Sequence, residues 1–285
     1  MNDILMQIRS DLPSFSKGQK RIANYILESY DKAAFMTASR LGKMVEVSES
    51  TVVRFAVELG FDGYPSMQKT LQELVRNRLT SVQRIEVTND RLGNQDVVSN
   101  VLQGDIDSLR MTGEALSREQ MNASVKAILK ARTVYIVGVR SSASLAAFLN
   151  FYLRNMLEDV RLVGSVATSE MFEQLLRVGP EDVVIGFSLP RYSSRTVKVM
   201  QYARNMGATC IAVTDKLDAP AGKVAEHVLI AKSDMLSVVD SLVAPMSVVN
   251  ALIVSLAQEQ QSQMSKTFED LESLWDEYDV YERVE

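Results

Sequence analysis

Residues 182–214 read DVVIGFSLPRYSSRTVKVMQYARNMGATCIAVT, and this stretch decides the fold. Two β-rich runs, at 182–188 and 208–214, enclose a segment from Ser193 to Met206 whose apolar residues recur at helical spacing. A strand, a helix and a second strand in this order predict two parallel strands joined by a helix that covers the sheet.

The same alternation extends outward in both directions. Further β-rich runs lie at 133–138, 160–164 and 227–231. The helices that we expect to separate the strands are Ser142–Leu157, Thr168–Leu176, Ser193–Met206 and Ala219–Ala225. Helical segments are also expected at 96–116, 118–131 and 239–264. The sequence therefore predicts an α/β domain with a five-stranded parallel sheet flanked by helices.

The first 80 residues have a different, wholly helical pattern. Apolar residues at helical spacing predict helices over Phe15–Leu27, with Ser14 or Ser16 as N-cap, and over Thr37–Val45. After a tight break at Glu46-Val47, Ser48 is the expected N-cap of a third helix that ends at Gly60. A fourth helix is expected from Ser66, as N-cap, through Leu79. Residues 81–95 lose this periodicity and predict a linker.

The short helix, tight turn and third helix within residues 37–59 have the spacing of a helix-turn-helix. In such motifs the N-terminal residues of the second helix of the pair contact base edges in the major groove of DNA. The expected base-reading residues are Ser48, Glu49, Ser50, Thr51 and Arg54, and the expected phosphate contacts are Lys17, Lys20, Arg40 and Lys43. A helical bundle that never meets DNA would show the same spacing, so the pattern alone leaves both interpretations open.

Two loops rich in serine and arginine follow the first and third predicted strands. They are residues 138–142 (GVRSS) and 187–196 (FSLPRYSSRT), and each leads into a helix. The carboxyl ends of parallel strands lie at one edge of the sheet, where helix N-termini favour anions. Serines at such positions also cap helices, but two such loops on one edge favour an anion site. Gly138 begins no G-x-G-x-x-G motif, since Arg140 and Ala143 occupy the other glycine positions, so a dinucleotide site is not expected.

Composition excludes several classes of protein. The 285 residues are 46% hydrophobic and 24% charged, which is ordinary for globular domains and leaves room for two of them. One cysteine and one histidine exclude an internal disulfide and a histidine-based metal cluster. No apolar run reaches the roughly 18–20 residues of a membrane span, and the N-terminus lacks the apolar core of a secretory signal. We therefore expect a cytoplasmic protein without membrane contact, metal or cofactor.

The net charge of −5 is unevenly distributed along the chain. Residues 1–80 carry 11 basic and 9 acidic side chains, whereas the remainder carries 20 and 27, and residues 266–285 alone hold 8 acids. Only the first part of the chain therefore has a charge suited to an anionic partner. The acidic C-terminal stretch is expected to form a solvated helix or a frayed tail.

The two halves together resemble a known family. FSKGQKRIANYIL (15–27) and ASRLGKMVEVSESTVVRFAVELGFDGYPSMQKTL (38–71) resemble the N-terminal domain of the MurR/RpiR family of bacterial transcriptional regulators. Residues 133–231 are similar to the SIS (sugar isomerase) domain that follows it in that family. The resemblance implies a regulator of carbohydrate genes that binds double-stranded operator DNA as a homodimer or homotetramer. It also implies that the SIS domain senses a phosphosugar or related anionic sugar metabolite.

The resemblance also implies effector ligands. The SIS motif S-x-S-G-x-T matches Ser193-Ser194-Arg195-Thr196 at its last four positions, with Ser194 in place of glycine. Residues 189–192 intervene after Ser188, so the loop is longer and carries an arginine and a tyrosine that the simple motif lacks. The expected effector-binding residues are Ser141, Ser142, Ser188, Arg191, Tyr192, Ser193 and Thr196.

Some SIS proteins are sugar-phosphate isomerases, which require a general acid and base near the sugar. His227 opens a predicted strand and Glu170 and Glu173 lie on a helix, so no catalytic residue is expected and a regulator is favoured over an isomerase with an accessory helical domain. The expected domains are 1–80 for DNA binding, 81–117 as linker and connecting helix, 118–265 for effector binding, and 266–285 as acidic tail.

Overall fold

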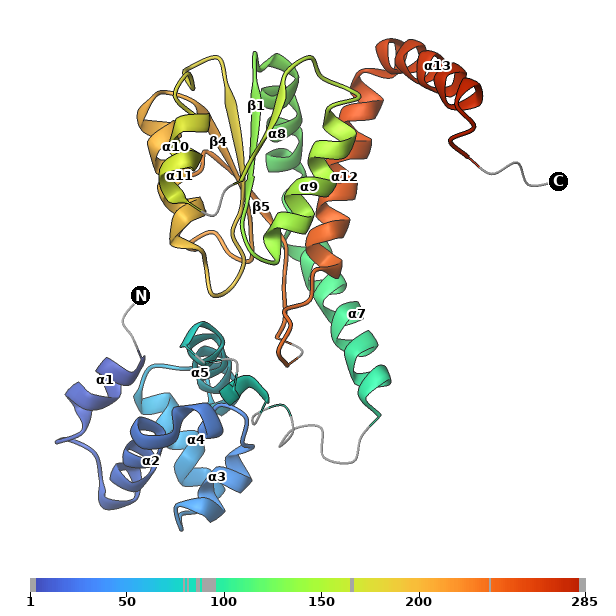
Figure 1. Cartoon of the computed structure of the whole chain (residues 1–285). Helices are drawn as coiled ribbons and strands as arrows, with labels where there is room; N and C mark the ends of the chain where they lie inside the picture. Colours follow the sequence, from blue (N-terminus) through green and yellow to red (C-terminus); the bar gives the residue numbers. More distant parts are fainter. Residues whose placement is uncertain are drawn as a thin grey trace. The chain divides into compact units, whose positions relative to one another are not determined.

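The computed structural model describes residues 4–78, 80, 82–85, 88, 96–164, 167–235 and 237–281 (Figure 1). The chain divides into two compact units. The first comprises Met1–Asn100 with Met235–Val239, and the second comprises Val101–Asp234 with Asp240–Glu285.

The first unit is a bundle of helices around a single core. Its helices are α1 (Ile4–Asp11), α2 (Lys17–Ala33), α3 (Ala38–Met44), α4 (Glu49–Glu58) and α5 (Tyr64–Arg78). Each contributes buried apolar side chains, and the rings of Phe15 and Phe55 meet edge to face at 5.1 Å between centroids. Val52, Phe55 and Ala56 of α4 and Leu59 at its end are at most 4% exposed, at the spacing of one helix face.

The expected helices of this unit are present, with three differences. Helix α1, whose Ile4 and Ile8 are buried, was not predicted, because eight residues carry too little periodicity to stand out. Ser66 is not an N-cap, because α5 begins at Tyr64 and accommodates Pro65 in its first turn, where no N–H is needed. Of the predicted linker 81–95, the described residues 82–85 and 88 are helical, and Leu79 lies outside the described residues.

The second unit is a five-stranded parallel sheet covered on both faces. Its strands are β1 (Val134–Gly138), β2 (Val160–Val163), β3 (Val183–Phe187), β4 (Thr209–Thr214) and β5 (His227–Ile230), in the order β2-β1-β3-β4-β5. Val134 pairs with Val160 on one side and with Val183 on the other, and this register runs along all three strands. The predicted parallel five-stranded sheet is confirmed.

Alternate side chains of each strand face two separate cores. Ile136 and Ile185 pack with α8 (Arg118–Lys130), α9 (Ser142–Leu153) and α12 (Val243–Glu259). Val137 and Val184 pack with α10 (Thr168–Gln174) and α11 (Ser194–Asn205) on the other face. The residues of β1, β3 and β4 are buried almost throughout, which is why these strands read as continuous apolar runs, whereas β2 is largely exposed.

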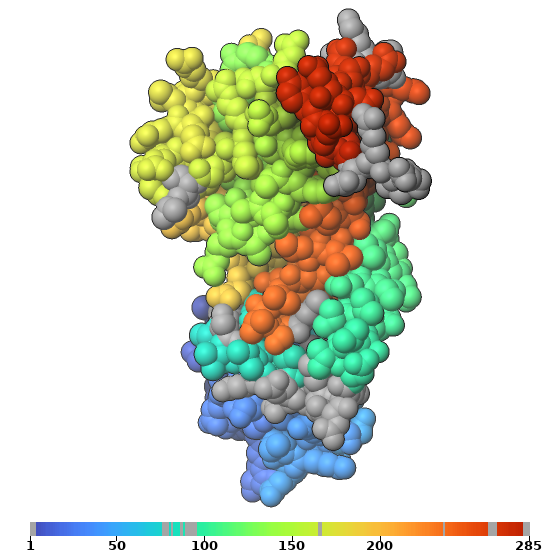
Figure 2. All heavy atoms as spheres, turned by 45° about the vertical axis from the view of Figure 1, so that its right-hand side comes forward, coloured from blue at the N-terminus to red at the C-terminus, as the bar shows by residue number. Residues whose placement is uncertain are grey.

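Two expectations about the helices of this unit are wrong. Residues 219–225 form turns and no regular helix, and the backbone at Gly222 approaches its neighbours so closely that a Cβ there would lie 2.4 Å from the Leu217 carbonyl oxygen. The helix expected over 239–264 ends at Glu259, and a new helix, α13 (Gln261–Glu277), takes in most of the acidic stretch. Figure 2 shows α13 at the surface, where its described side chains are largely exposed. The helix α7 (Val97–Ala115) precedes α8 as expected.

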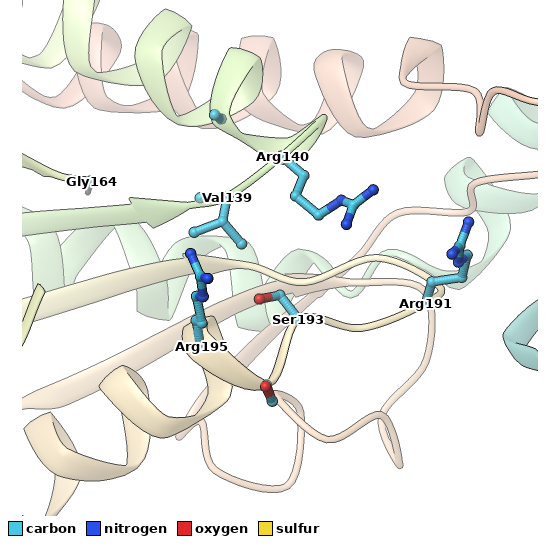
Figure 3. A pocket seen from close by; sticks show the side chains of 9 residues that line it. Val139, Arg140, Gly164, Arg191, Ser193 and Arg195 are labelled. Atoms are coloured by element: carbon cyan, nitrogen blue, oxygen red, sulfur yellow. The ribbon is translucent and has the colours of Figure 1, made fainter. Parts of the chain in front are cut away.

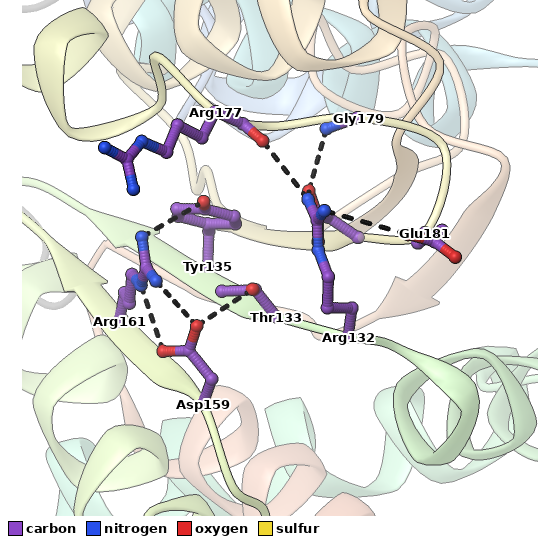
Figure 4. A network of polar contacts seen from close by, with 9 residues as sticks. Arg132, Thr133, Tyr135, Asp159, Arg161, Arg177, Gly179 and Glu181 are labelled. Carbon is purple, nitrogen blue, oxygen red and sulfur yellow. Dashed lines mark hydrogen bonds and ion pairs between the residues drawn. The ribbon is translucent and has the colours of Figure 1, made fainter.

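A polar network closes the amino ends of β1, β2 and β3 (Figure 4). Arg132 donates two hydrogen bonds to buried Asp182, at 3.0 and 2.7 Å. Arg161 makes a matching pair to Asp159, which also accepts from Thr133 Oγ1 at 2.9 Å. The hydrogen bonds from Arg161 hold the pKa of Asp159 below its ordinary value. The two-pronged Arg132–Asp182 pair links the start of β1 to that of β3, and the Thr133–Asp159 hydrogen bond links β1 to β2.

Replacing Gly42 with alanine is expected to destabilise the first unit. A Cβ at Gly42 would lie 2.8 Å from the Val47 carbonyl oxygen, so the turn after α3 would have to shift. Gly18→Ala is the matched control: its Cβ would meet Thr51 and Val47 side chains at an ordinary 3.5 Å, and alanine favours helix by about 0.5–1 kcal/mol. Urea denaturation followed by circular dichroism should show a lower midpoint for Gly42→Ala alone; equal midpoints would contradict the packing described.

Candidate functional site

The turn between α3 and α4 is built by a tight set of backbone hydrogen bonds. Val47 N–H donates to the Gly42 carbonyl at 2.8 Å, and Glu46 N–H donates to that of Lys43 at 3.4 Å. This pairing is a Schellman motif, in which the residue after the cap is left-handed and usually glycine. Here it is Glu46, with φ 54°. Arg21 supports the strained residue, donating to its carbonyl oxygen at 3.3 Å and pairing with its carboxylate at 3.4 Å.

The first turn of α4 is held by its own hydroxyl groups. Ser48 is the N-cap, as predicted, and accepts from the Thr51 N–H at 3.3 Å. Its Oγ also lies 2.9 Å from Ser50 Oγ and 2.8 Å from Thr51 Oγ1. Ser48 and Thr51 therefore define where the helix begins, and the outward part of this turn is left to Glu49, Ser50 and Arg54.

The residues expected to contact DNA all lie in this unit, and all but Thr51, which is half-buried, are exposed. Arg54 donates from Nε to the Ser50 carbonyl at 3.4 Å, which directs it along the exposed side of α4. The start of α2 packs against this helix, since Gly18 approaches Thr51 and Val47. Lys17 therefore lies near the first turn of α4.

Val53 and Val57, which the sequence patterns did not single out, are also exposed on α4, at 38% and 55%. Both lie outside the face of α4 that Val52, Phe55 and Ala56 bury, so helical spacing could have placed them at the surface. Beside Arg54 they offer apolar contacts of the kind that thymine methyl groups accept.

The second candidate site is a cavity of about 560 Å³ at the carboxyl edge of the sheet. Its lining follows three adjacent strands: β1 supplies residues 138–140 and β2 supplies Gly164, while the loop after β3 supplies Arg191 and residues 193–195. Ala143 of α9 completes it. Figure 3 shows Arg195 on one side of Ser193, with Arg140 and Arg191 on the other. Open parallel sheets bind ligands at this edge.

Two of the arginines occupy strained backbone. Arg140 has φ 56° and Arg191 has φ 63°, in the left-handed region that costs a non-glycine residue about 1–2 kcal/mol. Gly138 allows the turn that holds Arg140, because a Cβ there would lie 2.5 Å from the Ser142 carbonyl oxygen. Strain of this kind gathers at binding sites.

Of the seven residues expected to bind the effector, Arg191 and Ser193 line the cavity. Ser141 is exposed and makes no side-chain capping bond, whereas Ser142 is buried at the start of α9. Tyr192 donates its hydroxyl hydrogen to Asp215 Oδ1 at 2.8 Å. Arg140 and Arg195 line the cavity and were not among the seven, although they stand in the predicted loops; only the fold shows that both line one cavity.

The remaining two hydroxyls of that set lie beneath the loop after β3. Ser188 and Thr196 are 1% and 0% exposed, and neither side-chain oxygen has a hydrogen-bond partner among the described residues. Ser193, the N-cap residue of α11, makes no side-chain capping bond either. The start of α11 therefore has hydroxyl groups and first-turn amides with hydrogen-bonding capacity to spare.

Three residues considered above as possible acids or bases lie outside the described cavity lining. His227 opens β5, as predicted, and is not among the described residues of the cavity lining. Glu170 and Glu173 of α10 are not in the described lining either. Burial raises the pKa of the Cys210 thiol to about 12, so the thiol stays protonated and inert at neutral pH.

Each of the two units matches a known protein domain. Residues 2–78 match the helix-turn-helix domain of the rpiR family, and residues 127–255 match the SIS domain. An uncharacterized HTH-type transcriptional regulator of Haemophilus influenzae is 30% identical over 237 residues, which cover 80% of this chain and 79% of that protein. The HTH-type transcriptional regulator HexR of Pseudomonas aeruginosa is 27% identical over 219 residues, covering 75% and 74%.

Solved structures show the same architecture. The sugar isomerase domain of an RpiR transcription factor from Sphaerobacter thermophilus is 28% identical, with a TM-score of 0.60, and the match covers 63% of this chain and 99% of that one. The Vibrio vulnificus NanR protein, in a complex with ManNAc-6P, has a TM-score of 0.59 at 19% identity, over 96% and 98% of the two chains. At 19% identity, the similarity to NanR shows a shared fold and nothing further.

Thr196→Val is expected to leave the unfolding midpoint unchanged or to raise it. A buried hydroxyl without a partner costs about 1–3 kcal/mol, and valine fills the same space without that cost. The control is Thr214→Val, which removes a 2.6 Å hydrogen bond from Thr214 Oγ1 to the Ser188 carbonyl and should destabilise by about 1 kcal/mol. Urea denaturation of both variants measures the difference; a clear loss in Thr196→Val would mean that its hydroxyl has a structural partner.

Proposed function

This chain belongs to the rpiR family of helix-turn-helix transcriptional regulators with a SIS domain, and we propose that one of its two units binds DNA and the other binds a small effector. Residues 1–80 form the DNA-binding domain and residues 118–265 the effector-binding domain. The observation that carries the proposal is the presence, in one chain, of an exposed polar helix start in a helix-turn-helix and an arginine-lined cavity at the edge of a parallel sheet.

In this proposal α4 enters the major groove of operator DNA. Glu49, Ser50 and Arg54 face the base edges, where arginine makes its two-pronged contact with guanine. Ser48 and Thr51 fix the start of the helix through their hydrogen bonds to each other. Their hydroxyl oxygens can accept or donate a further hydrogen bond, and this bond goes to the DNA. Lys17, Lys20, Arg40 and Lys43 hold phosphates and fix the register.

The cavity receives a small anionic sugar derivative. Its proposed ligands are Ser188, Arg191 and Tyr192 in the loop after β3, Ser193 and Thr196 at the start of α11, and Ser141 and Ser142 at the start of α9. Binding alters DNA affinity only if the effector prefers one of two conformations of the chain, since a ligand shifts an equilibrium by its difference in affinity. The relatives are named as transcriptional regulators, which favours this function over that of an isomerase.

The proposed assembly is a homodimer or homotetramer acting in the cytoplasm, where two-fold symmetry would match a palindromic operator. Exposed apolar side chains in the second unit support it. Phe151 of α9 is 63% exposed and Val254 of α12 is 55% exposed, on two helices that pack against each other. No helix of the described chain is long and apolar enough to cross a membrane.

Arg54→Ala is expected to weaken binding to the operator by about 1–3 kcal/mol, or roughly 5- to 150-fold, while affinity for nonspecific DNA changes little. Titration of a labelled fragment from the promoter of its own gene, with and without competitor DNA, measures both. Lys130→Ala, which removes an exposed positive charge from α8, is the matched control and should bind as the unmodified chain does. Equal losses in both variants would argue against recognition by α4.

Ser193→Ala is expected to have the opposite profile, with DNA affinity retained and its response to a phosphosugar reduced. The substitution removes a hydroxyl from the cavity without removing a capping bond, so the fold should be unaffected. Titration of phosphosugars into the chain bound to DNA measures the response. An unchanged response would exclude Ser193 from the effector site.

Phe151→Asp is expected to lower the mass of the particle in solution, because a carboxylate placed in an apolar interface must be desolvated. Light scattering coupled to gel filtration measures it. Leu176→Asp is the control, since Leu176 is 76% exposed and follows α10, on the other face of the sheet. A particle of unaltered mass in Phe151→Asp would place the interface elsewhere.

A further inference from the structure

Three hydrogen bonds, each 2.8 Å long, connect the loop after β3 to α7. Tyr192 donates its hydroxyl hydrogen to Asp215 Oδ1, directly after β4. Lys232, just beyond β5, donates from Nζ to the Asp215 carbonyl oxygen and from its backbone N–H to Thr112 Oγ1 of α7. We propose that this series, Tyr192–Asp215–Lys232–Thr112, transmits effector binding in the cavity to the DNA-binding unit. The inference rests on the proposed function of the cavity as the effector site.

Tyr192 is the switch at the cavity end of the series. It stands between two residues of the cavity lining, Arg191 and Ser193. Its hydroxyl group has one hydrogen, which goes either to Asp215 or to an anionic oxygen of the effector. Arg191 is left-handed, with φ 63°, a conformation that a non-glycine residue keeps only where its surroundings hold it. The proposed switch therefore has two states, one with Tyr192 bound to Asp215 and one with Tyr192 bound to the effector.

The departure of Tyr192 changes the acceptors that are open to Lys232. The Asp215 carboxylate loses a donor, and it is a stronger acceptor than the carbonyl of the same residue because it is charged. The Lys232 ammonium therefore exchanges the carbonyl for the carboxylate. Ala231 N–H donates to the Thr214 carbonyl oxygen at 2.8 Å, so pairing of the strands holds the chain up to this point. The displacement of Lys232 is passed forward along the chain.

The far end of the series is a helix whose buried side chains are polar. Ser108 and Thr112 are the buried residues of α7, every residue of which the structure describes. Ser108 Oγ donates to Asp234 Oδ2 at 3.5 Å, and Ser241 Oγ donates to Asp105. Positions 105, 108 and 112 lie on one face of the helix. Because hydrogen bonds are directional, a shift of the segment after β5 must move α7 or break these bonds.

Two parts of the chain connect these residues to the first unit. One is α7, because its residues 97–100 belong to the first unit and the rest of the helix to the second. The other is the segment after β5, since Asp234 belongs to the second unit and Met235 is buried in the core of the first. Ser241 N–H donates to the Asp234 carbonyl at 2.9 Å and closes the base of this segment. The series thus ends on both segments that join the two units.

Hydrogen exchange of the full chain, followed by mass spectrometry, tests the series without any ligand. Tyr192→Phe keeps the ring and removes the hydroxyl group, so it should release Asp215 as the effector does. Peptides covering residues 105–115 of α7 should then exchange about threefold faster or more, because the bonds that hold this helix are lost. Peptides covering α9, which also borders the cavity, should exchange as in the unmodified chain.

Tyr202→Phe is the matched control for that experiment. Tyr202 lies on α11, where its ring packs edge to face on Phe172, and its hydroxyl group is outside the series. This variant should leave the exchange of α7 unchanged. Unchanged exchange of α7 in Tyr192→Phe, or an equal increase in α7 and α9, would overturn the inference.

Variants of Thr112 test the transmission to DNA. Thr112→Val removes the oxygen that accepts from Lys232, whereas Thr112→Ser keeps it. Calorimetry with a panel of aldose and ketose phosphates, including glucose 6-phosphate and N-acetylmannosamine 6-phosphate, identifies a sugar that binds. Titration of the promoter fragment with and without that sugar then gives the change in DNA affinity. Thr112→Val should lose most of this change and bind the sugar within about threefold of the unmodified chain, and Thr112→Ser should retain the change.

The outcomes separate this inference from the proposed function. If a sugar of the panel alters DNA affinity equally in Thr112→Val and in the unmodified chain, the series is wrong and the proposed function stands. If no sugar of the panel binds while operator DNA is still recognised, the inference fails together with the effector half of the proposed function.

Discussion

The cavity at the carboxyl edge of the sheet depends on one topological constraint. In the order β2-β1-β3-β4-β5, the helix after β1 covers one face of the sheet and the helix after β3 covers the other. The two connecting loops leave neighbouring strands in opposite directions, so the carboxyl edge opens between them. The open space is lined by whatever side chains these loops carry, and here these are mainly serines and arginines.

The two edges of the sheet have contrasting electrostatics. At the amino edge, Arg132 and Arg161 are each matched to a carboxylate, and the strands are locked together. At the carboxyl edge, the described cavity lining provides three arginines and no carboxylate. The arginine–carboxylate pairs stabilise the amino edge, whereas the arginine-rich lining of the carboxyl edge has the charge that an anionic ligand would require.

Left-handed backbone at non-glycine residues links the two candidate sites. Glu46 takes this conformation in the turn that sets the angle between α3 and α4, and Arg140 and Arg191 take it beside the cavity. A glycine would serve each turn at lower energy. The side chains are therefore the reason for the strain: Glu46 pairs with Arg21, and the arginines bring charge to the cavity.

The sequence by itself determined the classes of both units, the strand positions, and the capping of α4 by Ser48, because periodicity and capping depend on residues close together in the chain. It also identified the two loops that border the cavity. Only the tertiary structure decided which side chains of those loops converge. Arg140, Arg195 and Gly164 come from loops far apart in sequence, and the order of strands, which no local pattern encodes, brings them together. The same holds for Gly222, where the backbone packs closely against Leu217 in turns that replace the expected helix.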